Sequence, residues 1–284
     1  MNNRSRTFIA ALGACAAFGT NAAPVTFSAS GSNAAGIQGT VDAFRTSLGS
    51  LNPNVAGSFG SGRREINWDG VPDAFAAPNN LPASFFNVNS PRGVVFSTPG
   101  TGFQVSANAA SPTSTPIEFG NIDPTLPSQF ATFSAQRLFT ALGSTITDVS
   151  FFLPGSSTAA TVSAFGVVFT DVDLPNVTSI QFFDFFNVSL GMFNVPVSGA
   201  GVVANEGLSF LGVAFTTERV GRVRITSGQG ALGSSGLDVV AMDDFIYAEP
   251  LAAIPEPETY SLLLGGLALV GWAGRRAGWG APRA

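Results

Sequence analysis

Nearly all of the side chains in this sequence that could carry chemistry are carboxylates. Histidine is absent from the 284 residues, all 13 basic residues are arginine, and the one cysteine is Cys15. Serine–histidine and cysteine–histidine catalysis, histidine-ligated zinc and lysine Schiff bases are therefore excluded. Aspartate and glutamate chemistry, hydroxyl groups and metal sites with oxygen ligands remain.

Two acidic pairs are candidate metal ligands. Asp171 and Asp173 alternate along an extended stretch, so both carboxylates point to the same side, and Asp243 and Asp244 lie in the last predicted strand. Calcium accepts roughly six to eight oxygen ligands, and a bound ion would relieve the repulsion within each pair. We predict a calcium site from these four residues, formed where the central and final strands meet. The alternative is that they cap turns or pair with arginines.

Trp68 and Asp69 form a candidate ligand-binding segment. An aromatic face, here that of Trp68 or Tyr247, suits the apolar C–H surface of a sugar ring, and the Asp69 carboxylate is a hard oxygen ligand beside Trp68. The alternative is that Trp68 belongs to the core, as a single tryptophan in a β-sandwich usually does.

Glutamates could catalyse a hydrolysis, but the sequence does not indicate which two of them would act together. Two suitably spaced carboxylates can hydrolyse a glycosidic bond. No spacing pairs any two of the candidates, which are Glu65, Glu118, Glu206 and Glu218. We therefore predict no catalytic residue and a protein that is not an enzyme.

Many short strands must position these residues. The chain is 45% hydrophobic, with 26 phenylalanines that suit an interior between two sheets, and its 33 glycines and 18 prolines interrupt regular structure. We predict an all-β fold, an antiparallel two-sheet sandwich of jelly-roll type, over residues 23–253. The predicted strands are Val94–Phe96, Phe103–Val105, Ala131–Phe133, Thr147–Leu153, Thr161–Phe169, Ser179–Phe183, Ser189–Phe193, Phe210–Phe215, Arg222–Thr226 and Val239–Tyr247.

Two patterns refine this expectation. Apolar residues recur at helical spacing from Ile37 to Leu48, and Gly49 can end the short helix that this spacing predicts. Arg222 and Arg224 alternate with apolar residues, which predicts a half-buried strand with both arginines facing outward.

The charge of the body disfavours a nucleic-acid partner. The whole chain has a net charge of −5, and the stretch from about residue 23 to residue 254 holds 8 arginines against 16 acids. Nucleic-acid binding needs a basic face. A polyanionic polysaccharide would also be repelled unless a divalent cation bridged it.

The N-terminus has the three parts of a secretory signal peptide. Arg4 and Arg6 precede an apolar stretch that ends at Phe18, and Thr20-Asn-Ala22 provides the small residues of a cleavage site. We predict that residues 1–22 are removed. In the alternative, Leu12-Gly-Ala-Cys15 is a lipobox and Cys15 becomes the lipidated first residue.

The C-terminus combines a short motif with an apolar stretch. Ile254-Pro255-Glu256-Pro257 is followed by the 16 uncharged residues 259–274 and then by Arg275 and Arg276. As a helix this stretch would be about 24 Å long, a little less than the roughly 30 Å hydrocarbon core of a bilayer. We predict a short transmembrane helix with the basic end in the cytoplasm.

This order of parts resembles the PEP-CTERM sorting signal. Pro255, Glu256 and Pro257 match its namesake tripeptide, and the resemblance covers residues 254–284, although here the tail continues beyond the arginine pair. The resemblance implies recognition by exosortase, a membrane cysteine transpeptidase of Gram-negative bacteria that make exopolysaccharide. It also implies export through the inner membrane, transient anchoring by the C-terminal helix, and a final place at the cell surface or outside the cell.

The body also resembles the sandwich domains often found ahead of this tail, through Gly62–Gly70, Gly166–Asp173, Arg222–Ile225 and Met242–Phe245. That second resemblance implies no activity. We predict an exported, non-catalytic surface or biofilm-matrix protein that binds extracellular polysaccharide, with calcium as its possible cofactor. The alternatives are a secreted carboxylate-dependent enzyme that processes glycans, and a purely structural surface component.

Overall fold

The computed structural model describes residues 23–198, 206–216, 220–253 and 257–276. The predicted signal peptide, and Cys15 with it, lies outside this part of the chain. So do Pro255 and Glu256 of the predicted sorting motif.

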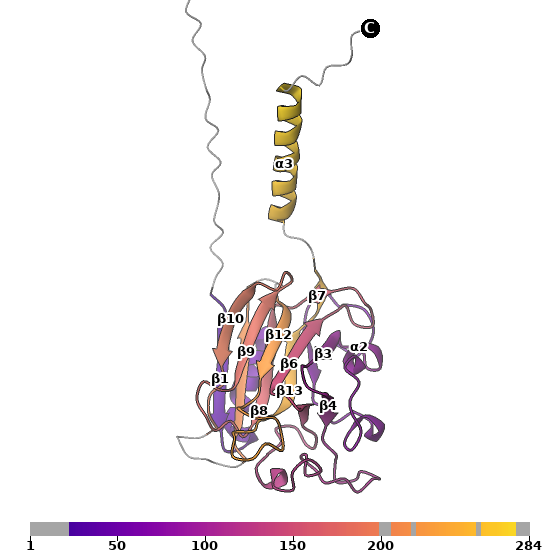
Figure 1. Cartoon of the computed structure of the whole chain (residues 1–284), viewed down its shortest axis with the longest axis vertical. Coiled ribbons are helices and arrows are strands. Elements are labelled where there is room, and N and C mark those ends of the chain that lie inside the picture. The colour runs from indigo at the N-terminus through magenta and orange to yellow at the C-terminus, as the bar shows by residue number, and fades with distance from the viewer. Residues whose placement is uncertain (1–22, 199–205, 217–219, 254–256, 277–284) are drawn as a thin grey trace, which may run out of the picture.

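Antiparallel strands form two main sheets, and Figure 1 shows the smaller one in front. The larger sheet has the order β1 (Val25–Gly31), β11 (Leu208–Ala214), β8 (Ala164–Thr170), β13 (Ala241–Ala248), β5 (Phe139–Leu142), β4 (Gly102–Val105), and β2 (Arg63–Ile66) also pairs with β13. The smaller sheet has the order β10 (Ser189–Asn194), β9 (Ser179–Asp184), β12 (Val220–Thr226), β6 (Ile146–Phe151), β3 (Val94–Ser97). A short pair joins β14 (Leu251–Ala252) to β7 (Ala160–Thr161). The predicted antiparallel all-β class is confirmed, whereas the jelly-roll arrangement is not.

The two sheets pack face to face through aromatic side chains. Phe151 of β6 meets Phe165 of β8 with ring centroids 6.0 Å apart, and Phe96 of β3 meets Phe139 of β5 at 5.0 Å. All four rings are buried. The phenylalanine-rich composition therefore supplies the interior between the sheets, as expected.

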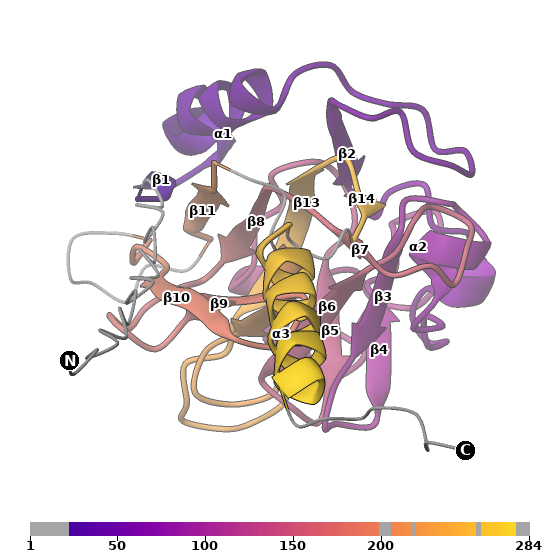
Figure 2. The same cartoon turned by 90° about the horizontal axis from the view of Figure 1, so that it is seen from above.

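Helix α1 (Ala34–Leu48) covers the outer face of the larger sheet, as Figure 2 shows. Ile37, Val41 and Phe44 form its buried stripe, and the chain leaves the helix at Gly49, where φ is 87°. The predicted helix and its end are thus confirmed. Phe44 packs so closely on the sheet that a Cβ added to Gly166 would lie 2.8 Å from its ring.

Some predicted elements differ from the structure. Ala131–Phe133 is not a strand, because the N–H of Ala131 donates to Thr170 Oγ1 and that of Phe133 to the Asp243 carboxylate instead of to a neighbouring strand. The sequence pattern also missed β1, β2 and β5. The remaining short helices are η1 (Asp73–Phe75), α2 (Phe85–Val88) and η2 (Leu126–Ser128).

Helix α3 (Pro257–Arg276) extends beyond the end of the sheets in Figure 1. Apolar side chains along it are exposed, among them Leu264, Leu269 and Val270. No helix in the described part of the chain is both long enough and apolar enough to cross a membrane. The predicted transmembrane helix is therefore not confirmed.

Candidate functional site

Asp243 and Asp244 lie at a bulge in β13. The strand pairs with β5 at Met242 and with β2 from Phe245 onward, and its register against β8 shifts between these two residues. The Asp243 carboxylate accepts hydrogen bonds from the N–H of Phe133 at 2.6 Å and from Ser134 Oγ at 3.2 Å. The Asp244 carboxylate accepts from Ser134 Oγ at 2.6 Å. Both aspartates are buried.

One arginine, Arg45, contacts this acidic pair through Asp244. Arg45 Nη2 lies 3.0 Å from Asp244 Oδ2, and the same guanidinium binds both carboxylate oxygens of Glu65 at 3.1 and 3.0 Å. Arg63 Nε donates to Glu65 at 2.6 Å. Helix α1 and strands β2 and β13 are thereby joined by one partly buried ionic network. Asp244 thus pairs with an arginine, as the alternative to calcium supposed, whereas Asp243 is bound by Ser134 and the N–H of Phe133.

The protonated form is favoured at both Asp243 and Asp244. Burial, and then the charge of Asp244, raises the pKa of Asp243 well above its ordinary value. Burial also raises the pKa of Asp244, but the hydrogen bond from Ser134 and the charge of Arg45 oppose that rise. The pair consequently retains a proton to higher pH than an exposed aspartate does.

A second group of acids, which we call the acidic end, lies where β8 ends and where the chain leads into β13. Asp171 directly follows β8 and is 4% exposed, and its Oδ1 has no hydrogen-bond partner. Both carboxylate oxygens of Asp238 are also buried without a partner. Asp173 is half-buried beside them. Within the described residues, no ion pair joins any of these three carboxylates to an arginine.

Burial and mutual repulsion favour the protonated forms at the acidic end. Burial, then the charges of Asp173 and Asp238, raises the pKa of Asp171 to about 7. Burial, then the charge of Asp173, raises the pKa of Asp238 to about 6. The backbone N–H groups of Asp173 and Leu174 oppose the second rise, although neither reaches hydrogen-bond geometry. Burial also raises the pKa of Asp173.

The predicted calcium ligands are divided between these two places. Asp171 and Asp173 interact with Asp238, whereas Asp243 and Asp244 are bound by Ser134, Phe133 and Arg45. Over the residues that the structure describes, no group of three or more acidic side chains is arranged to hold a metal ion. The described residues therefore give no support to the predicted convergence of Asp171 and Asp173 with Asp243 or Asp244, which stays a prediction. Asp238 was missed because nothing local in its sequence marks it as a partner of residues almost seventy positions earlier.

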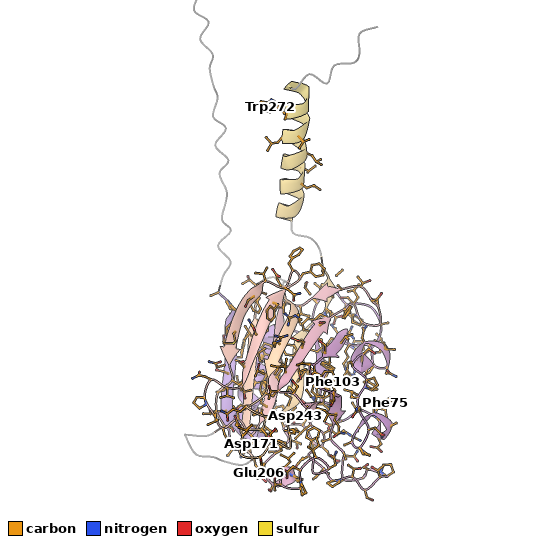
Figure 3. The ribbon with its side chains drawn as sticks, in the orientation of Figure 1. Phe75, Phe103, Asp171, Glu206, Asp243 and Trp272 are labelled. Atoms are coloured by element: carbon orange, nitrogen blue, oxygen red, sulfur yellow. The ribbon has the colours of Figure 1, made fainter. Side chains whose placement is uncertain are left out.

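Two of the candidate glutamates are close enough to interact. Burial, then the charge of Glu206, raises the pKa of Glu118. Both residues have left-handed backbone conformations, with φ of 48° and 68°. Glu206 precedes Gly207, whose carbonyl accepts from the N–H of Asp171 at 2.9 Å, and Figure 3 shows Asp171 and Glu206 at the same end of the body. Glu65 belongs to the ionic network above, and Glu218 lies outside the described residues.

The ligand-stacking role predicted for Trp68 is not available in this structure. The residue is 1% exposed, its ring stacks on Phe139 with centroids 4.1 Å apart, and its Nε1 donates to the carbonyl of Asp243 at 2.8 Å. Trp68 is a core residue, as the alternative interpretation held. Asp69 is half-buried, and its carboxylate accepts from the N–H groups of Gln136 and Arg137 at 2.5 and 3.0 Å.

The end of the body leads directly into the predicted tail. The last strand pairing places Ala252 opposite Ala160, and a hydrogen bond of 3.2 Å follows from the N–H of Ala253 to Ala159. A sequence model of the PEP-CTERM protein-sorting motif matches residues 253–277. The chain carries a PEP-CTERM sorting motif. The resemblance stated above is thereby confirmed.

The PEP-CTERM motif implies processing by exosortase and a place at the cell surface or outside the cell. It begins where the last strand pairing ends, so it covers little beyond α3 and the residues that link α3 to the body. No curated protein and no solved structure matches the chain. The match therefore concerns sorting and leaves the activity of the body open.

Proposed function

We propose that the body is a non-catalytic surface domain that exosortase detaches from its tail and that binds extracellular polysaccharide. The observation that carries the proposal is the position of the motif. Every strand of the two sheets, and the short β14–β7 pair, ends before residue 253, where the matched motif begins. A cut in the Pro255–Pro257 region would therefore leave the sandwich whole.

The ionic network around β13 supports a non-catalytic body. Asp243, Asp244 and Glu65 accept hydrogen bonds from arginines, a serine hydroxyl or backbone N–H groups. A general acid or base must reach the proton of a bound substrate, whereas both aspartates of this network are buried. The network instead fixes α1 on the larger sheet.

A glycan array probed with the purified full chain tests the proposed binding, with and without calcium. We expect retention of extracellular polysaccharides without release of shorter sugars. Retention only with calcium would assign an ion to the binding, although the described carboxylates form no metal site by themselves. Absence of retention under both conditions would contradict polysaccharide binding and favour the purely structural role.

One observation favours a second candidate, a carboxylate-dependent enzyme that processes glycans. Glu118 and Glu206 interact, and the raised pKa of Glu118 is the property of a general acid. Glycoside hydrolysis uses two carboxyl groups, one of which is a general acid with a raised pKa. In this alternative Glu118 protonates the leaving oxygen and Glu206 acts on the opposite face of the sugar.

The full chain incubated with the glycans that it retains distinguishes the two candidates. The non-catalytic proposal predicts no new reducing ends. The enzyme alternative predicts turnover that Glu118→Gln lowers at least a hundredfold, consistent with the loss of a general acid. Glu65→Gln is the matched control, because Glu65 is bound to Arg45 and Arg63 far along the chain from both glutamates.

A further inference from the structure

Arg92 differs from the other arginines of the body. Seven body arginines have described side chains, and six of them lie within 4.0 Å of a carboxylate oxygen. Those six are Arg45, Arg63, Arg64, Arg137, Arg222 and Arg224. Within the same part of the chain, no carboxylate pairs with Arg92. A partly buried charge without a counter-ion is unusual and marks a possible ligand site.

Among the described residues, hydrogen-bond partners are found for only some of the N–H donors of the Arg92 guanidinium. Nη1 donates to Ser90 Oγ at 2.5 Å, while Nε is buried with no hydrogen-bond partner. The guanidinium carbon lies 5.0 Å from the ring centroid of Phe86, which fixes the group by a cation–π contact. The backbone is fixed as well, since the N–H of Arg92 donates to Phe86 and its carbonyl accepts from the hydroxyl of Tyr247. The free charge is thus held in a defined position.

Arg92 lines a cavity of about 200 Å³. Asn67, Asn89 and Ser90 supply polar groups to its lining, and the apolar part of the lining includes Phe85 and Phe86. Asn67 and Asn89 are both exposed, so the cavity is reached from solvent. An anionic group, several hydroxyls and a small apolar face on one ligand would match this lining.

We infer that this cavity binds the carboxylate of an acidic sugar unit, with Arg92 as its counter-ion. The inference rests on the proposed polysaccharide binding and names the class of glycan. Arginine pairs with carboxylates through its planar fork of N–H donors, and the two asparagines supply donors and acceptors for ring hydroxyls. The cavity is smaller than the roughly 300–1,000 Å³ of pockets for drug-sized ligands, so it admits about one sugar unit.

The charge of the whole chain further restricts the class of glycan that can bind. A net charge of −5 repels a densely anionic polymer. A polysaccharide in which isolated uronic acid units alternate with neutral sugars avoids most of that repulsion and still supplies one carboxylate to Arg92. Such a glycan is the ligand class that we assign.

The test compares two oligosaccharides of equal length by titration calorimetry on the full chain, one alternating glucuronate with glucose and one containing glucose alone. We expect only the acidic one to bind. Arg92→Met should weaken its binding at least tenfold, since a hydrogen-bonded charge contributes about 1.5–3 kcal/mol. Arg224→Met, which removes a surface arginine already paired with Asp148, should change the affinity less than twofold.

A second variant guards against a folding defect. Asn89→Asp places a negative charge at an exposed position of the lining and should weaken the acidic glycan alone. Equal binding of both glycans, or acidic binding that survives both substitutions, overturns the assignment to Arg92 and leaves the proposed function standing. Absence of binding by both glycans contradicts the inference, and the array result then decides whether polysaccharide binding fails with it.

Discussion

At the scale of single residues, the acidic end contains carboxylates that destabilise the fold when ionised. Asp171 is almost fully buried, and it faces Asp173 and Asp238 with no paired arginine among the described residues. Its pKa rises from 3.8 to about 7, so the folded state binds the proton more tightly than the unfolded state does. Its contribution to stability is fully present below the unfolded pKa and is lost as the pH rises through about 7.

Asp171→Asn should therefore stabilise the protein at pH 8, by about 2 kcal/mol after an allowance for solvent screening. The gain should disappear at about pH 3, below the unfolded pKa of 3.8, where Asp171 is protonated in both the folded and the unfolded state. Asparagine also tolerates the left-handed backbone at this position, where φ is 66°. Urea unfolding at both pH values measures the change, with Asp42→Asn on the exposed face of α1 as the control. A substitution that destabilises at pH 8 would show that the ionised carboxylate has a favourable partner, such as a bound cation.

At the scale of elements, the ionic network decides how α1 sits on the larger sheet. Arg45 of α1 joins Glu65 of β2 to Asp244 of β13, and their positions along the chain differ by 20 and 199 residues. The apolar stripe of α1 covers the sheet, and Phe44 packs closely on Gly166. Directional charged hydrogen bonds add a second constraint on the position of the helix.

Arg45→Met should lower the free energy of unfolding by roughly 2–3 kcal/mol, because it leaves Glu65 and Asp244 without their shared counter-ion. Glu65→Met alone should also destabilise, and the double variant should lose less than the sum of the two. A double-mutant cycle in urea gives the coupling, which we expect to exceed about 1 kcal/mol. Arg224 and Asp148 form a comparison pair whose arginine is more exposed, at 43% against 20% for Arg45, so we expect a smaller coupling there. Coupling at Arg45 and Glu65 no larger than at this comparison pair would contradict the proposed role of the network.

The same two scales show what the sequence could predict. The spacing of Ile37, Val41 and Phe44 predicted α1, and the alternation around Arg222 and Arg224 predicted β12 with both arginines outward, because these signals are local. The pairing of β2 and β5 with β13 has no comparable signal. Strand β2 begins with two arginines, one of which is buried because Glu249 compensates its charge from 185 positions away.

The prediction of the candidate sites was limited in the same way, because the residues that form them lie far apart in the sequence. Which aspartates share a site depends on the register of β8 against β13 and on the bulge at Asp243, and neither can be read from composition or periodicity. The sequence therefore identified Asp171 and Asp173 as a pair, but it could not show that Asp238 interacts with them. Arg92 was missed entirely, since its lack of a paired carboxylate among the described residues becomes visible only in the folded structure.

At the scale of the whole molecule, the order of the β body and the sorting motif along the chain indicates function most clearly. A mostly antiparallel β body ends at β14, and the PEP-CTERM motif occupies residues 253–277 directly after it. Removal of the tail then costs the body none of its strand pairs. We therefore expect the protein to be exported and exosortase to process it at this junction.

The mass of the exported protein, measured intact by mass spectrometry from a bacterium with exosortase and from one without it, tests this claim most directly. With exosortase, we expect a chain that begins near Ala23 and lacks everything beyond the Pro255–Pro257 region. Without exosortase, or with Glu256→Ala, the tail should remain. An exported chain that still ends in Arg283-Ala284 when exosortase is present would contradict the account.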